Sequence, residues 1–144
     1  MAKQWLHGYQ YGPYWVPPLI APGTISNLYL AWNSQDVVKR SLHVVAAAAI
    51  FSILPITFLY MEPGVNGACK WKVQSLLKDE GFSLPETSVF VPSSVKHGST
   101  PASRRWAEKS EMEDLIRFWQ KMNNVRWAIA GFAAVMSGYG TLVL

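Results

Sequence analysis

The side chains best suited to proton transfer and to the stabilisation of an anion are one histidine, two amides and a guanidinium. His43 lies in a stretch of the chain that has no Lys, Arg, Asp or Glu. An ionisable residue in such surroundings is a functional candidate, and burial favours the neutral imidazole, which can accept a proton. Asn123 and Arg126 are three residues apart, so a helix would place both on one face, where they could stabilise an oxyanion. Asn66, which follows the uncharged stretch with Glu62, adds a second amide beside a carboxylate.

Each of these residues also has a purely structural interpretation, which the sequence leaves open. His43 could be an interfacial histidine bonded to a headgroup or to a neighbouring helix. Asn123 and Arg126 could, with Trp119, anchor a helix at the depth of the lipid headgroups. The Pro and two Gly residues around Asn66 are sufficient to end a helix without any function.

The sequence contains no familiar catalytic motif. A nucleophile elbow, a paired-histidine zinc motif, a P-loop and a glycine-rich dinucleotide motif are all missing. The three histidines are His7, His43 and His97, and none is three or four residues from another. We therefore predict no metal site, although haem ligation by distant histidines stays open. His7 reads as an interfacial residue and His97 as a solvated one in a Ser/Gly/Pro linker.

The elements that must position these residues are apolar enough to lie in lipid. Residues 41–61 carry no charge and are long enough to cross a bilayer as a helix. Residues 127–144 form a second such stretch, and residues 11–32 a third that contains four prolines. Most of the charge lies in residues 70–126, and the net charge is +4 without a basic run interleaved with aromatics. We expect contacts with the lipid bilayer and no nucleic acid partner.

The predicted fold is all-α, a small transmembrane helical bundle with three spans and an amphipathic helix that leads into the last span. Residues 1–144 are taken as a single membrane domain. The expected spans are about 13–32, 37–61 and 124–144, with an extramembrane loop and helix over 62–123. We expect a kink or a helix start near Gly23 from the prolines of the first span, a helix stop after Met61, and a long helix from about Ala102. Cys69 is the only cysteine, which excludes an internal disulfide.

This arrangement predicts a multi-pass integral membrane protein. The distribution of Lys and Arg favours a cytosolic N-terminus and a cytosolic loop, and the endoplasmic reticulum is one candidate membrane. The prolines of the first span and Pro55 of the second would leave backbone carbonyls without helical partners, so these sites should face protein rather than lipid.

The spacing of several residues resembles the anthrone oxygenase family of small membrane proteins. An aromatic-Gly-x4-Pro element begins the pattern, and two clusters follow, one at the end of the second span and one at the start of the last. The residues that carry the resemblance are Tyr11, Gly12, Pro17, Pro55, Thr57, Met61, Pro63, Asn66, Trp119, Asn123 and Arg126. Members of the family usually have one more transmembrane helix before the aromatic element. The resemblance thus implies either a shortened form of the family or a homo-oligomer or partner helix that replaces a missing first span.

The resemblance implies a membrane-embedded oxygenase that oxidises an anthrone to an anthraquinone with O₂ in polyketide secondary metabolism, with no added cofactor. Such a monooxygenase would need a base, oxyanion donors and an apolar pocket for a polycyclic aromatic substrate. The catalytic residues would be His43 as the base, with Asn66, Asn123 and Arg126 for the anion. The substrate-binding residues would be Tyr11, Trp15, Thr57, Met61 and Trp119. The alternative is a non-catalytic membrane protein that carries hydrophobic intermediates or assembles with partner subunits.

Overall fold

The computed structural model of the chain describes residues 1–93 and 95–142. It is helical, and in its described part β pairing is confined to an isolated bridge between Glu86 and His97. The elements in chain order are α1 (Ala2–Tyr9), α2 (Gly12–Asn33), α3 (Val37–Pro55), η1 (Ile56–Asn66), α4 (Gly67–Leu76), η2 (Lys78–Glu80), α5 (Pro101–Lys109) and α6 (Met112–Leu142). The all-α prediction is confirmed. By contacts the chain divides into two compact units.

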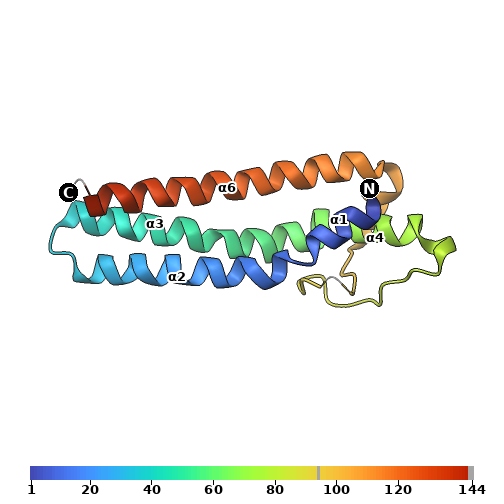
Figure 1. Cartoon of the computed structure of the whole chain (residues 1–144), viewed down its shortest axis with the longest axis horizontal. Coiled ribbons are helices and arrows are strands. Elements are labelled where there is room, and N and C mark those ends of the chain that lie inside the picture. Colours follow the sequence, from blue (N-terminus) through green and yellow to red (C-terminus); the bar gives the residue numbers. More distant parts are fainter. Residues whose placement is uncertain (94, 143–144) are drawn as a thin grey trace. The chain divides into compact units, whose positions relative to one another are not determined.

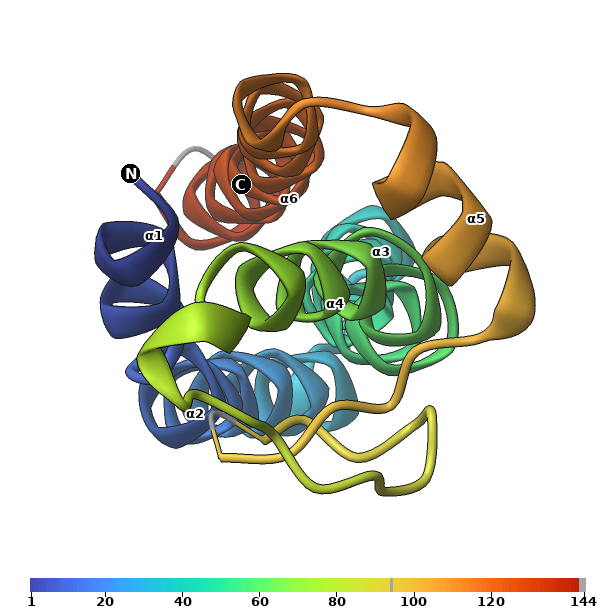
Figure 2. The same cartoon turned by 90° about the vertical axis from the view of Figure 1, so that its right-hand side faces the viewer.

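Unit 1 contains residues 1–15 and 55–123. Within it, α4 lies between α1 and α5 (Figure 2). Gly67 makes the approach of α4 to the α5 region possible, because a Cβ at this position would lie 3.1 Å from the Ser99 Cα. Buried apolar side chains from α1, η1, α4, α5 and α6 form one core, which includes Trp5, Tyr9, Met61, Val65, Ala68, Cys69, Val73 and Leu115.

Unit 2 contains residues 16–54 and 124–144, of which the structure describes those up to 142. Its helical segments, from α2, α3 and α6, lie side by side (Figure 1). Asp36 caps α3, since its carboxylate accepts a hydrogen bond from the Lys39 amide at 2.7 Å. Small residues such as Ala46 and Ala47 are buried in this unit.

The helix expected over about 13–32 is present, because α2 runs from Gly12 through Pro17, Pro18 and Pro22, and the alternative of a helix start near Gly23 is excluded. Two other local predictions are wrong. The second helix does not stop after Met61. The chain stays helical through Pro63 and Gly64 in the π-helix η1, whose wider turns accommodate residues that an α-helix would reject. The long helix from Ala102 is interrupted, since Ser110 has an extended backbone and separates α5 from α6.

Among the described residues, one helix is long and apolar enough to cross a membrane, the 40-residue run Val37–Leu76 made of α3, η1 and α4. It contains the second expected span. The first and third expected spans, about 13–32 and 124–144, do not meet this criterion within the described residues, so the prediction of three spans is not confirmed. Residues 143 and 144 of the third lie outside the described part.

Candidate functional site

Unit 1 contains a buried group of polar side chains around the carboxylate of Glu62. Tyr9 donates its phenolic hydrogen to this carboxylate, at 2.7 Å from Oε1 and 2.8 Å from Oε2. Asn66 Nδ2 donates to Oε2 at 2.7 Å, and Lys70 Nζ donates to Oε1. We call these four residues the Glu62 cluster. Three donors therefore converge on one carboxylate, and its negative charge is balanced by the ammonium of Lys70.

Water does not reach the Glu62 cluster. The exposed fractions of Glu62 and Lys70 are 1% and 0%. Burial raises the pKa of the Tyr9 phenol, and the charge of Glu62 together with its hydrogen bond raises it further, against a lowering by the Ser93 backbone. Tyr9 thus stays protonated and acts as a donor.

The sequence places three members of the Glu62 cluster four residues apart. Glu62 and Asn66 lie in η1 and Lys70 in α4, so successive turns of one continuous helix bring them to the same face. Tyr9 comes from α1, where Trp5 stacks on its ring at 5.2 Å between centroids. Lys70 Nζ lies 4.5 Å from the centroid of the same Tyr9 ring, which adds a cation–π contact.

Two polar atoms at this site have no hydrogen-bond partner among the described residues. They are Oδ1 of Asn66, an acceptor, and Nε1 of Trp5, a donor, and both are buried. Trp119 lies edge-on to Trp5 at 6.0 Å between centroids. Buried polar atoms are nearly always paired, so an unpaired acceptor beside a buried ion pair marks a functional candidate.

His43 belongs to unit 2 and has one polar partner in the described part of the chain. Its Nδ1 lies 3.0 Å from Oδ1 of Asn27, and the Asn27 Nδ2 donates to the Gly23 carbonyl at 2.9 Å. Because the Asn27 amide donates through nitrogen, its oxygen accepts, and the hydrogen of the imidazole is on Nδ1. His43 Nε2 therefore carries the lone pair that can take a proton.

The imidazole of His43 lies against a glycine of α6. A Cβ added at Gly140 would be 3.2 Å from Nε2 and 3.4 Å from Cε1, closer than most contacts of a real Cβ. His43 is buried, with an exposed fraction of 2%. A buried imidazole thus sits inside unit 2, oriented by one amide, and its Nε2 lies so close to Gly140 that any larger residue there would crowd it.

The other predicted residues are distributed over both units. In unit 1, Asn66 is part of the Glu62 cluster, Met61 is fully buried in the core, and Trp119 packs on Trp5. Thr57 and Asn123 are half-buried in the same unit, and Asn123 donates to the Trp119 carbonyl at 2.8 Å. Tyr11 and Trp15 are exposed. Arg126 lies half-buried in α6 of unit 2, the unit that holds His43.

Sequence reasoning missed Tyr9, Lys70 and Asn27. The spacing of an acid, an amide and an amine at positions 62, 66 and 70 could have indicated the Glu62 cluster. It does so only if the helix continues past Pro63, because only then do the three side chains share a face. His97, expected to be solvated, is buried in unit 1, where Nδ1 lies 3.1 Å from the Ser99 hydroxyl and the ring packs edge-on to Trp71. In the described residues no group of His, Cys, Asp and Glu side chains is arranged to hold a metal ion.

Comparison with known proteins identifies the family. The sequence model of the anthrone oxygenases matches residues 5–136. One curated relative, the anthrone oxygenase encC of Aspergillus fumigatus, is 27% identical over 145 aligned positions, which cover 96% of this chain and 72% of the relative. No solved structure matches. The match over nearly the whole chain, both units included, shows that this protein belongs to the anthrone oxygenase family.

Proposed function

We propose that this chain is a membrane-embedded oxygenase that converts an anthrone to an anthraquinone with O₂ in polyketide secondary metabolism. Membership of the anthrone oxygenase family is the observation that carries the proposal. The one described helix that is long and apolar enough to cross a membrane supports a membrane location. The three proposed spans lie over about 13–32, 37–61 and 124–144, and this helix contains the second of them. A hydrophobic polycyclic substrate would partition into the bilayer and reach such a protein from there.

The reaction needs a base more than any other group. The methylene of an anthrone is acidic because its anion is a delocalised phenolate. Once a base has removed the proton, the anion transfers an electron to O₂, the two radicals combine to a hydroperoxide, and loss of water leaves the quinone. The net change is anthrone plus O₂ to anthraquinone plus water, so the protein has to supply proton transfer, anion stabilisation and an apolar environment.

His43 is the proposed base. Its Nε2 carries the lone pair, its Nδ1 is held by Asn27, and its burial keeps water away from a reactive carbanion. Arg126 of the same unit is proposed to stabilise the anion electrostatically. The polar groups proposed for the same reaction in unit 1 are Asn66 and Asn123, and the proposed ring-binding residues are Tyr11, Trp15, Thr57, Met61 and Trp119. For all of these residues except Trp15, the assignment is supported by a spacing that resembles that of the family.

The test is O₂ consumption and quinone formation with emodin anthrone in membranes that contain the protein, against matched membranes without it. We expect a rate above the spontaneous one that a chelator does not change. His43→Ala should abolish this excess, whereas His7→Ala, which removes an exposed imidazole, should keep it. A fully active His43→Ala protein would remove the role of this base. No excess rate in a folded protein would favour a carrier of hydrophobic intermediates or an assembly partner.

A further inference from the structure

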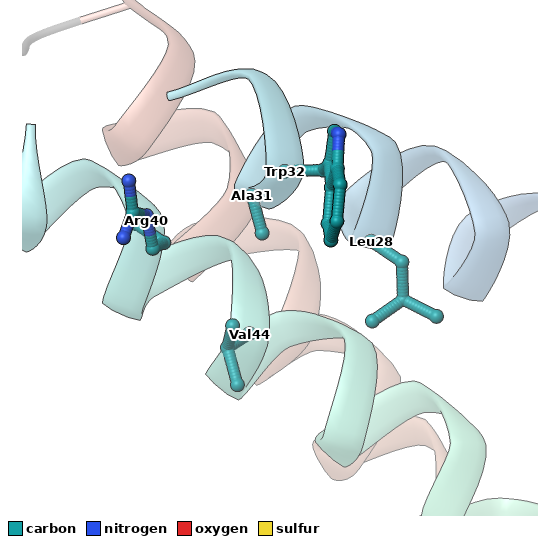
Figure 3. A pocket seen from close by; sticks show the side chains of 5 residues that line it. All are labelled: Leu28, Ala31, Trp32, Arg40 and Val44. Atoms are coloured by element: carbon teal, nitrogen blue, oxygen red, sulfur yellow. The ribbon is translucent and has the colours of Figure 1, made fainter. Parts of the chain in front are cut away.

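An open groove of about 400 Å³ lies between the α2 and α3 segments of unit 2. Leu28, Ala31 and Trp32 of α2 line one wall, and Arg40 and Val44 of α3 line the other (Figure 3). The side chains that line the groove are apolar apart from the guanidinium of Arg40 and the indole N–H of Trp32. Its size and its composition, apolar walls with one charged group, are those of a small-molecule site.

Arg40 is held in place at the groove. Its Nε and Nη2 both donate to the Ser34 carbonyl, at 3.3 and 2.8 Å, which leaves Nη1 without a partner among the described residues. The guanidinium is thus oriented by the backbone turn that joins α2 and α3. An oriented guanidinium presents its remaining donors as a fixed fork, the geometry that suits phosphate oxygens.

The charge of Arg40 is not neutralised by a neighbouring carboxylate. Asp36 is the only acidic residue in the sequence of unit 2, and its carboxylate caps the backbone of α3 at the Lys39 amide. No ion pair includes Arg40 in the part of the chain that the structure describes. A cation without a counterion, at one end of an apolar groove, suits an amphiphilic ligand that has an anionic head group and an apolar tail.

The surroundings of the groove fit the interface of a membrane. Trp32 and Tyr29 are strongly exposed, with 88% and 67% of their surface accessible, and aromatic side chains of this kind favour headgroup depth. Arg40 lies about one helical turn from the start of the helix that can cross a membrane. In a bilayer, a long basic side chain at such a position would reach the lipid phosphates, and the apolar walls beside it would face acyl chains.

We propose that this groove is a binding site for one anionic glycerophospholipid, whose phosphate pairs with Arg40 and whose acyl chain lies along Leu28 and Val44. This inference rests on the membrane location in the proposed function but not on the oxygenase reaction. The apolar walls distinguish the lipid from free phosphate, which would leave them exposed.

The experiment uses the whole chain purified in a neutral detergent. Phosphatidylglycerol, phosphatidylcholine or inorganic phosphate is added, and lipid adducts are counted by native mass spectrometry while the melting temperature is followed. We expect one retained phosphatidylglycerol and a higher melting temperature with that lipid, weaker retention of phosphatidylcholine, and no effect of phosphate. Arg40→Gln should weaken retention about tenfold or more, because a charge-assisted hydrogen bond is lost.

Two further variants make the result specific. Lys39→Gln removes the same charge from the neighbouring position outside the groove and should bind like the wild type. Val44→Phe fills the groove without a change in charge, at a position that is 47% exposed and tolerates a larger side chain. It should reduce retention. Equal loss in Lys39→Gln and Arg40→Gln, or unchanged binding in Val44→Phe, would overturn the site. Failure of the chain to fractionate with membranes would instead contradict the proposed membrane location.

Discussion

Lys70 and Glu62 form an ion pair inside unit 1, with the ammonium donating directly to Oε1 of the carboxylate and both side chains shielded from water. Transfer of two charges from water into a protein interior is unfavourable, and the pair persists because Tyr9 and Asn66 satisfy the rest of the carboxylate. The pair connects η1 to α4, and through Tyr9 it also connects both to α1. One buried carboxylate thus holds together three segments of unit 1.

Breaking this ion pair on one side should destabilise the protein strongly. Glu62→Gln or Lys70→Met each leaves one buried charge without its counterion, and we expect each to lower the free energy of unfolding by about 3–5 kcal/mol. The double variant removes both charges and should cost clearly less than the sum. Denaturant unfolding in detergent, followed by tryptophan fluorescence, measures this cycle. Single effects that simply add would show that the two side chains do not interact.

Much of this architecture was predictable from the pattern of charge and hydropathy. The uncharged run from Ser41 to Met61 suffices to locate most of α3. The continuation through Pro63 was not predictable, because a proline and a glycine normally end a helix, and only the packing of η1 in unit 1 offsets their unfavourable intrinsic preference. A helix that ended after Met61 would leave Glu62, Asn66 and Lys70 without a common helix face. The sequence therefore does not predict the Glu62 cluster.

The surroundings of the two buried histidines also depend on contacts between distant parts of the sequence. His43 could be selected from its apolar surroundings, but its partner Asn27 is sixteen positions away on another helix. The prediction of a solvated His97 follows from its Ser, Gly and Pro neighbours, and it is wrong because His97 is buried. Its burial depends on contacts with Trp71 and Ser99, which a local pattern does not contain.

The tautomer of His43 should depend on Asn27. In the wild type we expect the hydrogen on Nδ1, and Asn27→Ala should give a mixture because the acceptor is lost. Under the proposed function, turnover should fall about tenfold, which corresponds to 1.4 kcal/mol in the barrier. Nitrogen NMR of labelled histidine reads the tautomer directly, and O₂ uptake reads the rate. An unchanged tautomer in Asn27→Ala would show that another group orients the ring.

Substitution of Gly140 should reduce turnover, whereas substitution of Gly138, two residues earlier in α6, should not. A methyl at position 140 would lie 3.2 Å from His43 Nε2, so the imidazole must shift, whereas a methyl at position 138 meets nothing within 4 Å. Gly138→Ala should stabilise the helix by roughly 0.5–1 kcal/mol, since alanine has the higher helix propensity. Gly140→Ala should gain less stability and lose turnover.

Melting temperature and O₂ uptake, measured on both glycine variants, separate the two effects. Equal stability and equal activity in the two proteins would contradict the close approach of α6 to His43.

The segment around His97 should lose stability in acid. Burial lowers the pKa of His97 below its ordinary value of 6.5, and the positive charges of Arg104 and Lys70 lower it further, against the opposing effect of Glu86. A histidine whose folded pKa is lowered binds fewer protons in the folded state. Its contribution to stability is therefore complete above pH 6.5 and is lost as the pH falls through the lowered pKa of the folded state.

Hydrogen exchange of two backbone amides reports on this segment. The Thr87 amide donates to the His97 carbonyl at 2.9 Å, and the His97 amide donates to the Pro85 carbonyl at 3.0 Å. After correction for intrinsic exchange rates, we expect their protection to be constant above pH 6.5 and to decline below it. His97→Gln should remove the decline, while His7→Gln, at an exposed position, should leave it in place. Protection that falls equally in wild type and His97→Gln would assign the acid sensitivity to another group, with Glu86 in its ion pair with Arg104 as the nearest candidate.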